Sequence, residues 1–306
     1  MPLTLPITDA HVFERGWLSS NNVFFDDGKT SWLVDSGYST HSDQTLALVH
    51  QKLGGRPLDF LINTHLHSDH CGGNAALQNR YQSLMTLIPP GQADLVKSWD
   101  TEALTYDATG QQCPRFIYDQ VLSGESSIRL GKHIWEVYAA PGHDPDAILL
   151  FEPDHRILIS GDALWENGFG VVFPELEGTN AFGQVAATLD VIESLKPSVV
   201  IPGHGRMFFY TPAIAAVARQ RLNAFVQNPA KHARHAVKVL LKFKLLEVQQ
   251  QSFDEFSVWA NSTPYLKMCN ARFFDDMEFA FFIEQMCLEL VKSGAARMTA
   301  SCIHNA

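Results

Sequence analysis

The sequence predicts an α/β fold in which two mixed β-sheets are covered by helices and followed by a helical C-terminal part. Over the first two hundred residues, short β-branched segments bounded by Gly, Pro or Asp alternate with longer amphipathic segments. Some of these strand candidates adjoin as hairpins and others are separated by helices, which argues against one doubly wound sheet. From about Thr211 the pattern changes to nearly continuous helix.

The expected elements begin with an antiparallel hairpin. Segments 22–27 and 30–37 flank Asp27-Gly28, a dipeptide that tolerates the positive φ of a tight turn. Residues 41–55 then show helical periodicity and end at a Gly-Gly pair, which is typical of a helix stop. The remaining strand candidates are compact apolar segments at 57–64, 82–88, 133–140, 147–153, 155–161 and 197–203.

The C-terminal helices are expected at 211–227, 232–249, 252–261 and 275–294. We therefore divide the chain into a catalytic domain over residues 1–210 and a helical domain over residues 211–306. Because a metal-ligand candidate at position 204 leads almost directly into these helices, we expect the second domain to form a cap over the site. Within 232–249 the basic side chains are expected to face solvent, while four apolar side chains pack inward: Val237, Leu240, Leu241 and Leu245.

Composition excludes several classes of protein. The 306 residues are 46% hydrophobic and 18% charged, which excludes a disordered, collagenous or coiled-coil chain. No apolar run approaches the roughly 20 residues of a membrane-spanning helix, and the N-terminus has no signal-peptide pattern, so the cytoplasm is the expected location. The cysteines lack CxxC spacing and are expected to be reduced and mostly buried: Cys71, Cys113, Cys269, Cys287 and Cys302.

Charge is distributed unevenly along the chain. Residues 1–213 contain 12 basic and 25 acidic residues, whereas residues 214–306 contain 11 basic and 8 acidic residues. The net charge of −10 argues against a dedicated nucleic-acid binder, since phosphate neutralisation supplies most non-specific affinity. A local basic patch in the C-terminal part and a homo-oligomer both remain open.

The most informative motif is LINTHLHSDHCGG, in which His65, His67, Asp69 and His70 follow an apolar strand within six residues. Imidazoles and carboxylates are ligands that zinc prefers and that iron or manganese also accepts. The alternative is a polar strand-to-helix connection in which Asp69 lies at a helix N-terminus. Three histidines and an aspartate in so short a segment favour two adjacent metal sites.

Three further candidates repeat this context. His143, Asp162 and His204 each come directly after a strand candidate and a glycine. A glycine allows the backbone to turn sharply there, and strands that end at one edge of a sheet bring such residues together. Any one of these residues could be an ordinary loop residue, but their shared context indicates a metal centre.

Together, THLHSDH, PGH, GDALW and IPGHG resemble the metal-binding motifs of the metallo-β-lactamase-fold hydrolases, over about residues 8–207. The resemblance implies an αββα sandwich holding two divalent metal ions, zinc by ligand preference with iron or manganese as alternatives. The implied first site is His65, His67 and His143, and the second is Asp69, His70 and His204. Asp162 would bridge the two sites, which places the chain nearer the glyoxalase II, lactonase and ribonuclease Z branch than the antibiotic-degrading enzymes.

The chain departs from the glyoxalase pattern in two places. Residues 141–146 read PGHDPD where many glyoxalase-like members read PGHTPG, so Asp144 and Asp146 are either hydrogen-bond partners of the metal ligands or turn residues. The C-terminal part also lacks the cationic pattern with which glyoxalase II holds glutathione.

These features predict a metal-dependent hydrolase that uses a metal-bound hydroxide on a small ester, thioester or lactone, with Asp69 as general acid/base. Cys71 is expected to be a small apolar residue rather than a nucleophile. One alternative is an iron-dependent persulfide dioxygenase. Another is a lactamase-beta-like endoribonuclease, because residues 252–266 and 282–297 faintly resemble its winged-helix tail and 231–244 are basic. Nearby aromatic residues could line an apolar pocket: Trp165, Phe169, Phe173, Phe208, Tyr210 and Trp259.

Overall fold

A computed structural model describes residues 3–306, which form two compact units. The first unit comprises the residues up to Asp100 together with Gln112–Leu222, and the second comprises Thr101–Gln111 and Asn223–Ala306. The catalytic part predicted from the sequence therefore contains a short segment, 101–111, that packs with the C-terminal helices instead. No helix among residues 3–306 has the length and apolar character needed to cross a membrane.

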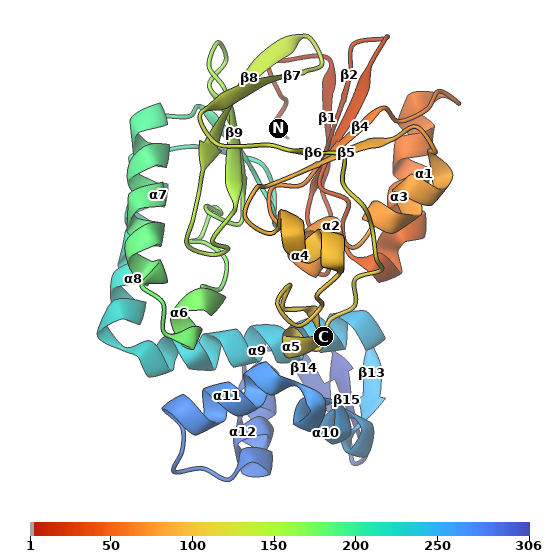
Figure 1. Ribbon diagram of the computed structural model, residues 1–306. Coiled ribbons are helices and arrows are strands. Elements are labelled where there is room, and N and C mark those ends of the chain that lie inside the picture. Colours follow the sequence, from red (N-terminus) through yellow and green to blue (C-terminus); the bar gives the residue numbers. More distant parts are fainter. Residues whose placement is uncertain (1–2) are drawn as a thin grey trace. The chain divides into compact units, whose positions relative to one another are not determined.

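Two six-stranded sheets form the first unit (Figure 1). One has the order β1-β2-β3-β4-β5-β6, with strands Ala10–Phe13, Asn22–Asp26, Ser31–Val34, Phe60–Ile62, Met85–Ile88 and Gln120–Val121. The other has the order β12-β11-β10-β9-β8-β7, with strands Phe208–Phe209, Val199–Pro202, Ile157–Gly161, Ile148–Glu152, His133–Ala139 and Ser126–Leu130. Both sheets combine parallel and antiparallel pairs, so the predicted pair of mixed sheets is confirmed.

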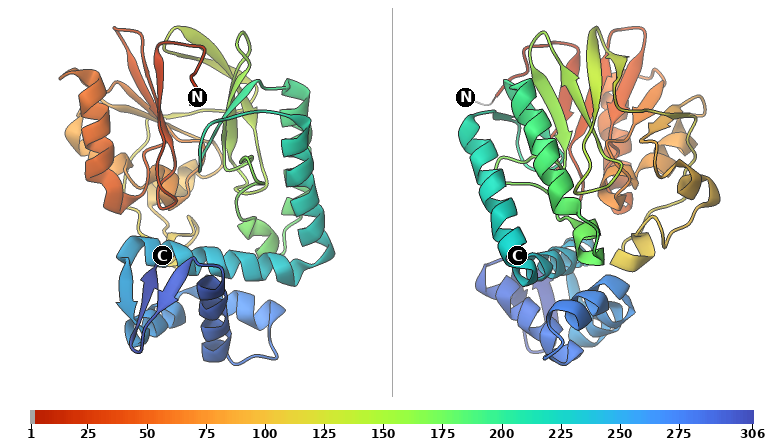
Figure 2. Two further views of the ribbon diagram at one scale, coloured as in Figure 1. Left: turned by 180° about the vertical axis from the view of Figure 1, so that it is seen from behind. Right: turned by 60° about the vertical axis from the view of Figure 1, so that its left-hand side comes forward.

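Helices cover the outer faces of both sheets, as Figures 1 and 2 show. Helices α1 (Ser42–Leu53) and α3 (Asn74–Arg80) lie beside the first sheet, and α7 (Ala181–Leu195) lies beside the second. Short helices occur in the connections: η1 (Ser39–His41), α2 (Ser68–Cys71), α4 (Ala93–Ser98) and α6 (Phe173–Glu177). This arrangement confirms the helix–sheet–sheet–helix sandwich.

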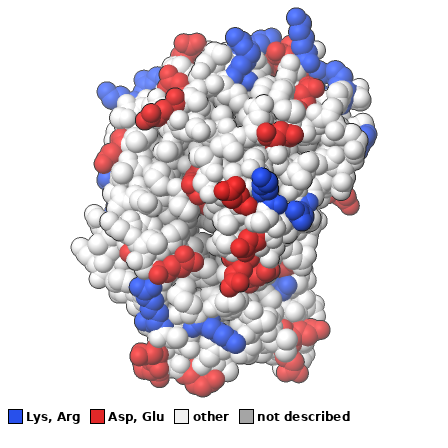
Figure 3. Space-filling view, in the orientation of Figure 1, with Lys and Arg blue, Asp and Glu red and all other residues white. Residues whose placement is uncertain are grey.

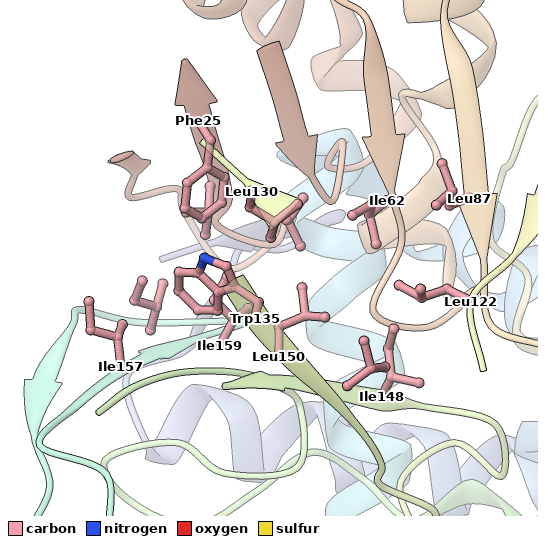
Figure 4. Packing of buried hydrophobic residues seen from close by; sticks show 14 of the residues in the cluster. Phe25, Ile62, Leu87, Leu122, Leu130, Trp135, Ile148, Leu150, Ile157 and Ile159 are labelled. Atoms are coloured by element: carbon pink, nitrogen blue, oxygen red, sulfur yellow. The ribbon is translucent and has the colours of Figure 1, made fainter. Parts of the chain in front are cut away.

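Strand alternation assigns the side chains of the first sheet to two separate cores. Phe24 and Leu61 pack against α1 and α3, whereas their neighbours Phe25 and Ile62 face the second sheet. The interior between the sheets is filled by aliphatic side chains around the fully buried Trp135, whose ring meets Phe25 edge-on at 5.3 Å between centroids (Figure 4). The predicted hairpin at Asp27-Gly28 is confirmed, with β2 and β3 antiparallel and Gly28 at a φ of 89°.

The second unit contains short strands that the sequence analysis did not predict. Its helices are α5 (Tyr106–Thr109), α9 (Pro229–Val248), α10 (Phe253–Ser262), α11 (Pro264–Phe273) and α12 (Phe279–Lys292), while α8 (Pro212–Gln227) begins in the first unit. Three antiparallel strands in the order β13-β15-β14 accompany them: Gln250–Ser252, Cys302–Asn305 and Ala296–Met298. These strands have three or four residues and little apolar character, too weak a pattern to predict.

Two smaller predictions are confirmed in the described chain. The four apolar side chains of α9 are at most 2% exposed: Val237, Leu240, Leu241 and Leu245. All five cysteines are free thiols; Cys71, Cys269 and Cys287 are buried, whereas Cys113 and Cys302 are partly exposed.

Replacing Trp135 with alanine should lower the free energy of unfolding by about 3–5 kcal/mol, because the change opens a cavity between the two sheets. Ile134 is the matched control, since it lies on the same strand but is 45% exposed. Ile134→Ala should change the unfolding free energy by no more than about 0.5 kcal/mol. Equal midpoint shifts for the two variants in chemical denaturation would contradict this description of the core.

Candidate metal centre

The strand ends bring all seven predicted ligand candidates to one edge of the sandwich. Strands β3 and β4 are parallel, and the HxHxDH segment follows β4. In the second sheet β10 and β11 are parallel, and β9 runs antiparallel to both β8 and β10. The residues after β8, β10 and β11 therefore leave the sheet at the same edge, and these residues are His143, Asp162 and His204.

One group of donors comprises His65, His67 and His143, with one ring nitrogen of each within 4.8 Å of the others. His67 Nδ1 lies 2.8 Å from His143 Nε2. His65 is 1% exposed and His143 is 7% exposed, so these nitrogens converge in a space that is mostly closed to solvent.

A second group comprises Asp69, His70 and His204, whose donor atoms also lie within 4.8 Å of one another. His204 Nε2 is 3.0 Å from Asp69 Oδ2. Asp69 is the most exposed of the three, with 16% of its side chain accessible. The structure thus brings together the same two sets of three residues that the resemblance implies.

Asp162 lies between the two groups. Its Oδ1 atom is 3.4 Å from His70 Nε2, and its Oδ2 atom is 3.5 Å from His143 Nε2 and 3.8 Å from His204 Nε2. The indole Nε1 of Trp165 donates a hydrogen bond to Asp162 Oδ1 at 3.1 Å, which helps to fix the carboxylate. This position suits a carboxylate shared by two cations.

Asp35 is a buried partner of the site that the sequence analysis missed. Its Oδ1 accepts the backbone N–H of Thr64 at 2.8 Å, and its Oδ2 accepts the Thr64 hydroxyl at 2.8 Å. Oδ2 also lies 2.8 Å from His70 Nδ1, while His65 Nδ1 lies 3.1 Å from Thr64 Oγ1. A signal was present, because Asp35 comes directly after the apolar strand β3, as the other candidates follow theirs.

The hydrogen-bond pattern of the imidazoles tests whether cations fit here. The outer nitrogens of His65, His70 and His143 are within hydrogen-bond distance of protein acceptors, for His143 the carbonyl of Val171 at 2.6 Å. By contrast, the inner nitrogens His65 Nε2 and His70 Nε2 are buried and make no hydrogen bond. A bonded outer nitrogen and a free inner one are typical of metal-ligating histidines, so the residues fit the implied ions.

Electrostatics at the site separates the histidines into two kinds. Burial, together with neighbouring imidazoles, lowers the pKa of His143 to about 4 and holds that of His65 well below its usual value. Burial opposes protonation of His70 as well, but the carboxylates of Asp35 and Asp162 raise its pKa well above the usual value. His65 and His143 are therefore neutral at neutral pH, as metal ligation requires, whereas His70 would release a proton when a cation binds.

The carboxylates of the site remain ionised despite their burial. Burial alone would raise the pKa of Asp162, but His204, His70 and His143 hold it well below its usual value. The same opposition lowers the pKa of Asp69, where the hydrogen bond with His204 and the nearby imidazoles outweigh burial. Both groups therefore carry negative charge at neutral pH.

Asp144 faces the site but does not hydrogen-bond a ligand candidate. Its Oδ2 atom is 3.9 Å from His67 Nε2 and accepts a hydrogen bond from Gln92 Nε2 at 3.2 Å. Its Oδ1 accepts the backbone N–H of Asp146 at 2.8 Å, which is the bond of an Asx turn. These contacts support the interpretation of Asp144 as a turn residue rather than as a hydrogen-bond partner of a metal ligand.

An aromatic group beside the site includes a residue that the sequence analysis missed. Trp17 is 57% exposed and stacks on His204, with 5.5 Å between ring centroids and 6° between planes. Trp165 meets both rings edge-on, and Phe173 meets His67 in the same way at 6.0 Å. Phe169 and Phe208 are instead buried in the core. The sequence around Trp17 does not indicate this role, because its stacking partner His204 lies far away along the chain.

The glycines before the three downstream candidates act in different ways. Gly142 and Gly161 have positive φ values of 139° and 49°, as the sharp-turn prediction requires. Gly203 instead provides space, since a Cβ atom there would lie 2.2 Å from Asp162 Oδ1 and 2.8 Å from the His70 ring. The backbone also bends at Gly203, so the predicted turn is present there, although without a positive φ.

The family model for the metallo-beta-lactamase superfamily matches residues 15–204, which include every ligand candidate. The chain belongs to the metallo-beta-lactamase superfamily. This membership confirms the resemblance on which the division of the ligand candidates into two sites was based.

Two curated superfamily relatives are hydroxyacylglutathione hydrolases. The protein of Dechloromonas aromatica is 32% identical over 174 residues, covering 57% of this chain and 53% of the relative. The protein of Brucella anthropi is 30% identical over 185 residues, covering 60% and 59%. The chain thus spans only a little over half the length of these relatives.

Solved structures of superfamily members share the fold at low sequence identity. The FEZ-1 metallo-beta-lactamase of Legionella gormanii matches 76% of this chain and 98% of its own, with a TM-score of 0.57 and 15% identity. A metallo-beta-lactamase family protein of Thermus thermophilus matches 97% and 99%, with a TM-score of 0.54 and 16% identity. The second match extends over nearly the whole chain.

Replacing Asp35 with asparagine should lower the pKa of His70, because it removes a carboxylate 2.8 Å from Nδ1 that favours the protonated ring. The pKa can be followed by imidazole NMR on the metal-free chain. Asp43→Asn, at an exposed position of α1, is the control and should leave the titration of His70 unchanged. An unaltered His70 titration in Asp35→Asn would contradict this account.

Replacing Gly203 with alanine should lower the free energy of unfolding by about 1–3 kcal/mol, because the new methyl group overlaps the Asp162 carboxylate. Gly16→Ala is the control, since a Cβ there meets no atom within 4 Å. Denaturant unfolding should separate the two variants, and identical midpoints would show that the strand end at Gly203 is not crowded.

Proposed function

We propose that this chain is a metal-dependent hydrolase that acts on a small acyl compound, a thioester or ester in the first instance and a lactone as a further case. The convergence of seven donor side chains, two of them with buried inner nitrogens that make no hydrogen bond, is the observation that carries the proposal. Membership of the superfamily supports it independently.

The proposed centre holds two divalent ions, with zinc as the ion that the donor set favours. His65, His67 and His143 would hold one ion, Asp69, His70 and His204 the other, and Asp162 would contact both. When bound, such ions supply a nucleophile from water near neutral pH and polarise the substrate carbonyl. The protein's own contribution is to fix the ligand rings, through Thr64 and Asp35 behind His65 and His70.

Asp69 is the proposed general acid/base. It is the carboxylate of the centre with the greatest access to solvent, and its lowered pKa keeps it ionised and able to accept a proton at neutral pH. The 3.0 Å contact with His204 Nε2 orients the carboxylate toward the centre. A serine or cysteine nucleophile is not required.

The proposed substrate class rests on the relatives and on the aromatic group. The curated relatives are named for hydrolysis of an acylglutathione thioester, which supports acyl-thioester chemistry here. Their glutathione part is not carried over, because the match covers little more than half of each relative. Trp17 presents an exposed aromatic face next to His204, a surface suited to an apolar acyl group.

The contacts of the basic helix do not favour the endoribonuclease alternative. Lys238 pairs with Glu289 at 3.0 Å, and Lys244 pairs with Glu247 at 2.9 Å. Lys242 Nζ donates hydrogen bonds to the carbonyls of Ala295 and Ala306. On the face shown in Figure 3, basic and acidic side chains are interspersed. These lysines are engaged within the C-terminal unit, whereas phosphate contacts require available cations.

A turnover screen combined with metal analysis tests the proposed function. Purified protein should contain close to two divalent ions per chain and should hydrolyse acyl thioesters or esters faster than phosphodiesters or RNA. Chelation should abolish that turnover, and added zinc should restore it. Iron content with oxygen consumption on a persulfide, or cleavage of RNA alone, would overturn the proposal in favour of one of the alternatives.

Asp69→Asn should reduce kcat by a factor of about 10² to 10⁴, because the amide can neither accept the proton nor supply a charged ligand. Cys71→Ala is the matched control two residues away. The Cys71 thiol is fully buried and donates to the carbonyl of Leu66 at 3.3 Å, so the variant should retain most of the activity. Equal losses in the two variants, both folded by circular dichroism, would point instead to a thiol nucleophile.

A further inference from the structure

A second cluster of potential ligands lies at the opposite edge of the second sheet. His133 begins β8, Glu152 ends β9, and His155 lies in the turn between β9 and β10. Glu152 Oε1 is 3.3 Å from His133 Nδ1, and Glu152 Oε2 is 3.2 Å from His155 Nδ1. One donor atom from each of the three residues lies within 4.8 Å of the others.

The carboxylate of this cluster is buried, whereas the imidazoles border solvent. The Glu152 side chain is 1% exposed, compared with 21% for His133 and 37% for His155. Among the described residues, no lysine or arginine forms an ion pair with Glu152. A buried carboxylate needs a compensating positive charge, and this one has only the two imidazoles next to it.

Asp9 adds an independent observation. Its side chain is 3% exposed, and its Oδ1 atom makes no hydrogen bond but lies 3.5 Å from His133 Nε2. Its Oδ2 accepts the backbone N–H of Lys132 at 2.5 Å, which holds the carboxylate in place. A buried acceptor behind the outer nitrogen of a histidine is the arrangement that orients a metal-binding imidazole.

We propose that His133, Glu152 and His155 bind one divalent transition-metal ion of the zinc class, separate from the proposed catalytic centre. The two Nδ1 atoms and the Glu152 carboxylate, which contacts one ring through each oxygen, would supply the protein ligands, and solvent access at His155 leaves room for a water. Donor atoms of a tetrahedral zinc site lie about 3.3 Å apart, close to the two contacts that Glu152 makes. Asp9, whose Oδ1 lies 3.5 Å from His133 Nε2, would be a positioning residue for that ring.

Zinc counting on the full chain tests this site. The chain is stripped with a chelator, titrated with Zn²⁺, and analysed by native mass spectrometry. His155→Ala should bind one ion fewer than the wild type, and alanine keeps the turn because the backbone N–H of residue 155 makes the 2.7 Å bond to Glu152. His50→Ala, which removes an exposed imidazole from α1, should bind as many ions as the wild type. Equal zinc counts in His155→Ala and His50→Ala would overturn the proposal.

Two further variants make the test of this zinc site independent of the test of the proposed function. Asp9→Asn should weaken zinc binding at this site about 10- to 100-fold. His65→Ala should remove zinc from the catalytic cluster while imidazole NMR still shows zinc-dependent shifts of His133 and His155. If those shifts are missing, the cluster is an ion pair of histidines with Glu152 and Asp9, and the proposed site is refuted whatever the outcome at the catalytic cluster.

Discussion

The geometry of the candidate centre depends on the buried Asp35 carboxylate, which holds Thr64 and His70 in position. It accepts both hydrogen bonds that Thr64 can donate and contacts His70 Nδ1, while the Thr64 hydroxyl contacts His65. Two imidazoles from one loop are therefore oriented through a single buried anion on the neighbouring strand. Because β3 and β4 are parallel and adjacent, the backbone places that anion and the HxHxDH segment at the same edge.

Much of the fold and of the candidate centre could be predicted from the sequence because the relevant signals are local. The pattern of an apolar strand followed by Gly and then His or Asp selected three donors, and the HxHxDH motif selected the other four. All seven converge in the structure. Asp35 also comes directly after an apolar strand, but no glycine precedes it and it lay outside the family motifs that guided the choice. The strands of the C-terminal unit were missed because three residues such as Gln250–Ser252 contain no readable alternation.

Other features could not be predicted because they depend on pairs of distant segments. Trp17 becomes part of the site only through its stacking on His204. The cluster of His133, Glu152 and His155 requires the register between β8 and β9, which no single segment encodes. The crowding at Gly203 could not be predicted either, because the atoms that exclude a side chain there belong to Asp162 and His70.

The distribution of the donors along the chain has a consequence for how the protein folds. The HxHxDH segment follows the fourth strand, whereas His204 follows the eleventh, so the donor set is complete only when nearly the entire sandwich has been synthesised and both sheets have docked. Contacts between such distant segments form slowly, since a long loop must close before they contribute stability. Metal ions would therefore bind at this centre late in folding. They would stabilise the assembled sandwich rather than nucleate its folding.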